Sequence, residues 1–140
     1  MDKNKANAQI LLLRERLVLR EKFPGASVTI EKGHLVWLDE IRPTPLSRNY
    51  LVEVTWDGVG RPKSFVRSPE LEPPPAKKLQ HVYSPDEICL FMPYEWKSTM
   101  LIADTIIPWT HEWLFQYELF RLKGDWYGGG HGTPAGAIPR

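Results

Sequence analysis

The feature that most constrains the fold is a proline-rich segment in the middle of the chain. Six prolines fall between residues 69 and 93, at Pro69, Pro73, Pro74, Pro75, Pro85 and Pro93. Because proline lacks a backbone N–H group and fixes φ, this distribution excludes a regular central helix or strand. We therefore expect an ordered connecting loop across this segment.

A helix is predicted at the N-terminus. Within residues 6–22, the apolar residues Ile10, Leu13 and Leu17 follow helical spacing and define one face of an amphipathic helix. The charged residues beside that face are Arg14, Glu15 and Glu21. A Phe-Pro-Gly sequence then ends the helix.

Four short runs rich in β-branched and aromatic residues follow the helix. They cover residues 28–30, 34–38, 50–56 and 63–67. Turn signals such as Lys32-Gly33 and Asp57-Gly58 separate them. This pattern predicts an antiparallel meander of about four strands.

The C-terminal part is predicted to be helical. Ser98 is a candidate cap for a helix that runs to about Ile107, where Pro108 either kinks the helix or begins a second one. An aromatic face follows, formed by Trp109, Trp113, Tyr117 and Phe120. Gly124 is placed to end the helix, and a glycine-rich tail is expected from about residue 126.

Length and charge limit the classes of function. With 140 residues we expect a single domain, residues 1–140, with one hydrophobic core. The 18 basic and 17 acidic residues leave a net charge of +1, which gives no support for nucleic-acid binding. No signal peptide or membrane span is evident, so we expect a cytoplasmic protein whose partners are other proteins.

Cys89 is the only cysteine and cannot form an internal disulfide. A thiolate is a strong nucleophile and a good leaving group, which suits acyl transfer. A free thiol has a pKa of about 8.5, so a nearby donor or positive charge would assist it at neutral pH, and His81 lies upstream across a proline-containing turn. Cys89 and His81 are therefore the candidate catalytic residues. The competing interpretations are an inert buried thiol and a histidine that only holds the loop in place.

The sequence around Cys89 resembles the active-site stretch of ubiquitin-conjugating enzymes, because His81, then Ile88-Cys89-Leu90, then Trp96 occur in the order found there. It is most similar to the small stand-alone conjugating-enzyme-like proteins of bacterial type II (short) CBASS antiphage operons. The segments that carry this second similarity are Thr105-Ile-Ile-Pro-Trp109, Glu112-Trp113-Leu114, Tyr117-Glu118 and Gly124-Asp-Trp126-Tyr-Gly-Gly-Gly130. The resemblance covers most of the chain.

The resemblance implies an α+β protein with the ubiquitin-conjugating (UBC) fold: an N-terminal helix, a four-stranded antiparallel meander, a proline-rich active-site loop and C-terminal helices. It implies a transferase in antiphage defence. Cys89 would form a thioester with the C-terminal tail of a cGAS-like nucleotidyltransferase and pass it to an acceptor protein. No cofactor or metal is expected, since the other histidines show no metal-ligand spacing with Cys89.

Other functions stay open. The same fold could serve as a non-catalytic adaptor that binds the nucleotidyltransferase, or as a conjugating enzyme for a bacterial ubiquitin-like protein. A cysteine hydrolase that uses Cys89 with His81 or His111 is a third possibility, although no third orienting residue is evident.

The oxyanion donor is unassigned by the sequence. Eukaryotic conjugating enzymes have a His-Pro-Asn turn, whose asparagine stabilises the oxyanion, and His81-Val82-Tyr83 stands in its place here. Tyr83, Ser84 and the backbone N–H groups beside Cys89 are the candidates, and the sequence does not rank them.

Overall fold

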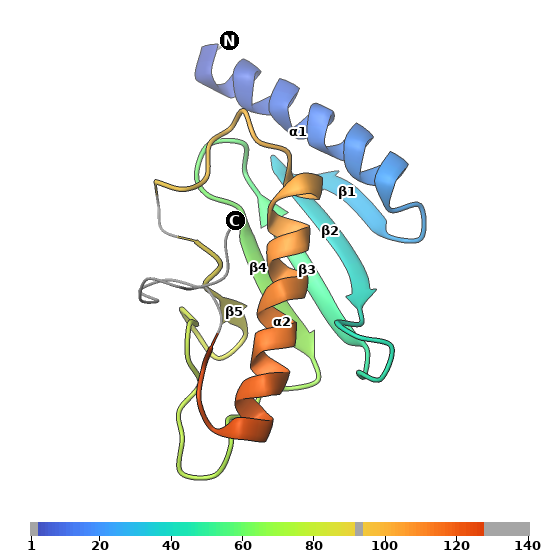
Figure 1. The fold of residues 1–140 in the computed structure, drawn as a ribbon. Coiled ribbons are helices and arrows are strands. Elements are labelled where there is room, and N and C mark those ends of the chain that lie inside the picture. Colours follow the sequence, from blue (N-terminus) through green and yellow to red (C-terminus); the bar gives the residue numbers. More distant parts are fainter. Residues whose placement is uncertain (1–2, 92–93, 128–140) are drawn as a thin grey trace.

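The computed structural model describes residues 3–91 and 94–127 and has an α+β fold (Figure 1). The helix α1 (Lys3–Lys22) precedes a five-stranded sheet, and the helix α2 (Ile106–Lys123) follows it. The strands are β1 (Ser27–Glu31), β2 (His34–Ile41), β3 (Tyr50–Trp56), β4 (Lys63–Ser68) and β5 (Glu87–Ile88). They lie in chain order, and each pairs antiparallel with the next.

The predicted meander corresponds to β1–β4, but the expected number of four strands is wrong. The fifth strand, β5, lies inside the proline-rich segment, where no regular element was expected. It pairs Ile88 with Ser64 and Glu87 with Phe65 of β4. A two-residue strand that contains no proline fits at the edge of a sheet, where a neighbouring proline breaks no central ladder.

The β1–β2 and β3–β4 connections contain residues whose backbone has a left-handed conformation with positive φ. Lys32 (φ 51°) and Gly33 (φ 77°) form the tight turn between β1 and β2, as their sequence predicts. Gly58 (φ 85°) lies against α1, where an added Cβ atom would come within 2.9 Å of the Cβ atom of Ala8. The β3–β4 connection therefore packs closely on α1 at a position where only glycine fits.

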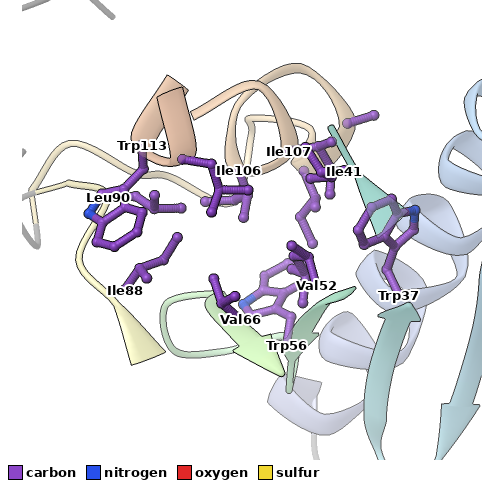
Figure 2. Close-up of a cluster of buried hydrophobic side chains, with 14 of the residues drawn as sticks. Trp37, Ile41, Val52, Trp56, Val66, Ile88, Leu90, Ile106, Ile107 and Trp113 are labelled. Carbon is purple, nitrogen blue, oxygen red and sulfur yellow. The ribbon is translucent and has the colours of Figure 1, made fainter. Parts of the chain in front are cut away.

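The core lies between the sheet and α2, which crosses one face of the sheet (Figure 1). Along β3, buried and partly buried residues alternate, as expected for a strand with one face in the core. Figure 2 shows side chains of the sheet, of α2 and of the segment around β5 meeting in one cluster. On α2, Trp113, Tyr117 and Phe120 are buried and Trp109 is partly buried, so the predicted aromatic face packs on the core.

The predicted orientation of α1 is wrong. Ile10, Leu13 and Leu17 are 63%, 50% and 71% exposed. The buried residues of this helix are Ala8, Leu12, Glu15 and Leu19. Leucine and valine residues occur on nearly every side of α1, so the apolar spacing alone does not select the buried face.

The buried carboxylate of Glu15 is part of the reason for this orientation. Glu15 is fully buried, and its Oε1 atom accepts a hydrogen bond from the N–H group of Ile102 (2.9 Å). Arg14 forms an ion pair with Glu15 and donates to the carbonyl of Met100 (3.2 Å). These contacts satisfy a buried charge that would otherwise be costly, and they tie α1 to the segment that precedes α2.

The start of the C-terminal helix also differs from expectation. Ser98 lies in a turn and caps no helix, and the first helical residues form the short 3-10 helix η1 (Ile102–Asp104). Pro108 is the third residue of α2, where its missing N–H group costs nothing. Gly124 (φ 82°) ends α2, as predicted, and its N–H group donates to the carbonyl of Phe120 (2.8 Å). Most of the expected glycine-rich tail lies outside the described residues.

Candidate active site

Cys89 lies at the end of a small β-hairpin formed by residues 81–89. Val82 pairs antiparallel with Ile88. Next to this pair, the backbone N–H group of Cys89 donates a hydrogen bond to the carbonyl of His81 (2.8 Å). The hairpin therefore places His81 directly across from Cys89, and the two candidate residues of the sequence analysis do come together.

The tip of this hairpin is closed by short-range hydrogen bonds. The N–H group of Tyr83 donates to the carbonyl of Glu87 (2.8 Å). The hydroxyl of Ser84 donates to the carboxylate of Asp86 (3.1 Å) and accepts from the N–H group of Glu87 (3.2 Å). Since these bonds fix the register, they also fix which side chains share a face.

One face of the hairpin carries the polar and reactive side chains. Side chains alternate between faces along paired strands, so His81, Tyr83, Glu87 and Cys89 lie on one face. Ile88, on the other face, belongs to the core. A cavity of about 460 Å³ adjoins the thiol, and its lining residues are Gln80, His81, Val82, Tyr83 and Cys89.

The thiol itself is held firmly and is nearly covered. Ile88 and Leu90, which flank Cys89, point into the hydrophobic cluster (Figure 2). The Sγ atom donates to the carbonyl of Phe91 over 3.9 Å, a long and weak contact, and Cys89 is 2% exposed. An acyl donor therefore reaches this sulfur only by entering the adjoining cavity or by displacing its walls.

His81 has a structural role through its backbone. Its φ of 56° lies in the left-handed region, where histidine is enriched several-fold among non-glycine residues. Its carbonyl accepts hydrogen bonds from the N–H group of Cys89 and from the indole N–H group of Trp113 (3.1 Å). The imidazole lies against Trp126, with 5.0 Å between ring centroids. His81 thus links the hairpin to α2 and to the segment after it.

Tyr83 is the side chain that interacts with the thiol. Burial, and next a hydrogen bond with the Cys89 side chain, raise the pKa of Tyr83 to about 12. Its hydroxyl therefore keeps its proton at neutral pH and is available as a hydrogen-bond donor beside the sulfur. The sequence named Tyr83 only as one unranked candidate.

Arg61 was missed by sequence reasoning. Its guanidinium group lies over the ring of Tyr83, 4.2 Å from the ring centroid, and pairs with Glu87 at 2.9 Å. Arg61 comes from the connection between β3 and β4, far from Cys89 in the sequence. No local motif marks it, and only the pairing of β5 with β4 brings it near the hairpin.

The remaining sequence candidates lie elsewhere or in the core. Trp96 and Trp113 are buried and belong to the core cluster. His34 and His111 are exposed, and His131 lies outside the described residues. Across residues 3–91 and 94–127, no three or more His, Cys, Asp or Glu side chains gather as metal ligands would. Neither helix longer than one turn in these ranges is apolar enough to cross a membrane.

The fold and the site define a small α+β protein that presents one cysteine on a β-hairpin beside a C-terminal helix. A search among curated proteins gave no match. The family model described as "Type II CBASS E2 protein" matches residues 15–134, which is most of the chain. The chain therefore belongs to the type II CBASS E2 family, and this membership assigns it an E2-like role in CBASS antiphage defence.

Proposed function

We propose that this protein is a cysteine acyltransferase that forms a thioester between Cys89 and the C-terminal carboxyl group of a cGAS-like nucleotidyltransferase. It then transfers that group to an amine of an acceptor protein. Family membership supports the E2-like role. The observation that carries the chemistry is the hairpin, which holds the only cysteine between two core anchors with a hydrogen-bond donor beside the sulfur.

The first step is acyl transfer to sulfur. The thiolate of Cys89 attacks the carbonyl carbon of an activated donor, which is a thioester or an acyl adenylate of the partner's C-terminus. The new C–S bond forms, and the bond to the donor's leaving group breaks. The thiol proton passes to a base or to water before the attack. Activation of the carboxyl group is supplied from outside this domain.

The second step is transfer to the acceptor. An amine of the acceptor protein attacks the thioester carbon, the C–N bond forms, and the thiolate of Cys89 leaves with the electrons of the C–S bond. The attacking nitrogen loses one proton. We assign the uptake of this proton to His81, which lies across the hairpin from Cys89 and lines the same cavity.

One observation favours a second candidate function. Because Cys89 is 2% exposed, the protein could act as a non-catalytic adaptor that binds the nucleotidyltransferase and leaves the thiol unused. Free cysteine is among the residue types that are most often buried. An adaptor does not need the sulfur, whereas an acyltransferase does. Substitution of Cys89 therefore separates the two functions.

The test is phage protection by the complete operon carrying wild-type protein, Cys89→Ala or Cys89→Ser. For the transferase, we expect Cys89→Ala to lose protection while it still co-purifies with the nucleotidyltransferase. Cys89→Ser should accumulate an adduct that resists added thiol, because an oxyester is more stable than a thioester towards thiols. Immunoblots control for the amount of each variant. Full protection by Cys89→Ala would contradict the transferase and support the adaptor.

A further inference from the structure

Acyl transfer to or from Cys89 passes through a tetrahedral intermediate whose oxygen carries negative charge. A donor aimed at this oxygen usually supplies a large part of the rate, and loss of one such donor costs about 10²–10³-fold in turnover. The asparagine that serves this role in His-Pro-Asn turns is absent from His81-Val82-Tyr83. The chain therefore needs a donor from another position near the sulfur.

The register of the hairpin places Tyr83 beside Cys89. Val82 pairs with Ile88, so Glu87 lies directly opposite Tyr83, and Cys89 is the diagonal neighbour on the same face. Diagonal neighbours lie within reach of an aromatic side chain. Both side chains line the cavity next to the thiol, and their interaction is one of the causes that raise the pKa of Tyr83.

Two of the other donors that the sequence suggested are already engaged. The N–H group of Cys89 donates to the carbonyl of His81 (2.8 Å). The hydroxyl of Ser84 donates to Asp86 (3.1 Å) and lies at the tip of the hairpin. Gln80 also lines the cavity, but it precedes the paired residues and lies outside the register that places Tyr83 beside the sulfur.

Arg61 and Glu87 hold the ring of Tyr83 in place. The guanidinium group of Arg61 lies 4.2 Å from the ring centroid and pairs with Glu87 at 2.9 Å. Glu87 is fixed by its backbone, since it pairs with Phe65 of β4 and its carbonyl accepts a hydrogen bond from the N–H group of Tyr83. Cation–π contact and ion pair together restrict the rotamers of a side chain that is otherwise 44% exposed.

We infer that Tyr83 is a catalytic residue that donates its hydroxyl hydrogen to the acyl oxygen in the tetrahedral intermediate at Cys89, and that Arg61 is its positioning residue. The inference rests on the proposed function, because it requires an acyl group on Cys89. Before acylation the hydroxyl donates to sulfur. As the C–S bond forms, the sulfur becomes a poorer acceptor and the adjacent oxygen gains charge, so the same hydroxyl transfers its hydrogen bond to that oxygen.

The experiment uses a synthetic peptide that ends in a glycine thioester of mercaptoethanesulfonate. Intact-mass spectrometry follows the uptake of the acyl group by Cys89 and its later discharge to hydroxylamine. Tyr83→Phe keeps the ring beneath Arg61 and removes only the hydroxyl. We expect uptake and discharge to slow by about tenfold or more in this variant, which should still be folded at the assay temperature by circular dichroism. Gln80→Ala tests the other polar side chain of the cavity. Tyr94→Phe is the matched control, because it removes the hydroxyl of an exposed tyrosine outside the cavity lining, and it should retain the wild-type rates.

The possible failures are distinguishable. Rates for Tyr83→Phe within about twofold of the wild type would overturn the role of Tyr83 and leave the proposed function intact. Slowing by Gln80→Ala together with normal rates for Tyr83→Phe would assign the donor to Gln80 instead. A wild-type protein that takes up no acyl group, either from this peptide or from the nucleotidyltransferase in cells that express the complete operon, would overturn both the proposed function and this inference.

The positioning role of Arg61 has its own readout in a double-mutant cycle. Because Arg61 acts through Tyr83, Arg61→Ala should slow discharge in the wild-type background and have little further effect in the Tyr83→Phe background. Arg61→Lys keeps a cation over the ring and should restore part of the rate. A residue with a merely structural role would give additive effects, and additivity here would overturn the assignment of Arg61.

Discussion

At the scale of single residues, His81 combines backbone and side-chain roles that substitution can separate. Its left-handed φ of 56° costs an L-residue roughly 1–2 kcal/mol, and its carbonyl accepts two hydrogen bonds. Both features belong to the backbone and survive loss of the imidazole. The proposed proton uptake belongs to the ring alone.

The first prediction compares His81→Gly with His81→Ala. Glycine adopts the left-handed backbone freely, so the glycine variant should be more stable than the alanine variant by about 1 kcal/mol in denaturant unfolding. Both variants lack the ring and should discharge acyl-Cys89 more slowly, by a similar factor. Unchanged discharge in both would contradict proton uptake by His81 and leave it a structural residue.

The second prediction concerns alkaline pH. Burial and the hydrogen bond with Cys89 raise the pKa of Tyr83 to about 12, whereas an unfolded tyrosine titrates near 10. Between these values the unfolded chain binds fewer protons at this residue than the folded protein does. The contribution of Tyr83 to stability is therefore complete below about pH 10 and declines as the pH rises towards 12.

Tyr83→Phe should reduce this alkaline decline, as measured by denaturant midpoints at several pH values. Tyr50 is the control, because burial and its hydrogen bond to Glu118 (2.8 Å) also raise its pKa. Tyr50→Phe should therefore remove a separate part of the decline. An identical decline in wild type and Tyr83→Phe would show that Tyr83 ionises in the folded protein as it does in the unfolded chain.

At the scale of elements, the sequence predicts best where one local signal dominates. Lys32-Gly33 predicts the first tight turn, and Gly124 predicts the end of α2, because both depend on backbone that few residues adopt. The start of α2 could not be predicted from Ser98, since the helix begins at Ile106 and Thr105 is the residue that precedes it. The fifth strand could not be predicted, because two residues are too few to show the alternation of apolar and polar side chains that marks a strand.

The orientation of α1 shows a limit of periodicity. Its buried face includes the carboxylate of Glu15, whose partner Ile102 lies far along the chain. No local pattern predicts that a charged position is buried when a distant N–H group satisfies it. The exposed Ile10, Leu13 and Leu17 have the same helical spacing as a core face. The sequence alone therefore does not decide whether these residues or the observed buried residues of α1 face the core.

The third prediction tests this orientation. Leu12→Ala and Leu19→Ala should each destabilise the protein by about 2–5 kcal/mol, because they leave cavities in the core. Leu13→Ala and Leu17→Ala, at exposed positions of α1, should change stability by no more than about 0.5 kcal/mol. Denaturant unfolding measures both pairs. Equal losses for the two pairs would contradict the observed burial of α1.

The candidate site was only partly predictable for related reasons. The order of His81, Ile88, Cys89 and Leu90 in the sequence indicates that the histidine and the cysteine come together. The diagonal contact of Tyr83 depends on the register of a short hairpin, which the hydrogen bonds of its turn decide. The contact of Arg61 with Tyr83 depends on how β5 joins β4, which is a property of the whole sheet.

At the scale of the whole molecule, the hairpin that bears Cys89 is supported from two sides. Its β5 strand extends the sheet next to β4, and Trp113 of α2 donates to its first carbonyl. Ile88 and Leu90 anchor it in the core (Figure 2). This support leaves the sulfur in a fixed position beside a cavity, which suits a site that must hold a reacting atom steadily.

The most direct test of the account is the intact mass of this protein after purification from cells that express its complete operon, the nucleotidyltransferase included, measured with and without added thiol. We predict a wild-type species heavier by the mass of the nucleotidyltransferase less one water, which thiol removes. Cys89→Ser should give the same gain in a thiol-resistant form. A mass gain equal to the mass of a ubiquitin-like protein less one water would instead support conjugation of such a modifier. Unmodified masses alone, from proteins that still co-purify, would contradict acyl transfer at Cys89.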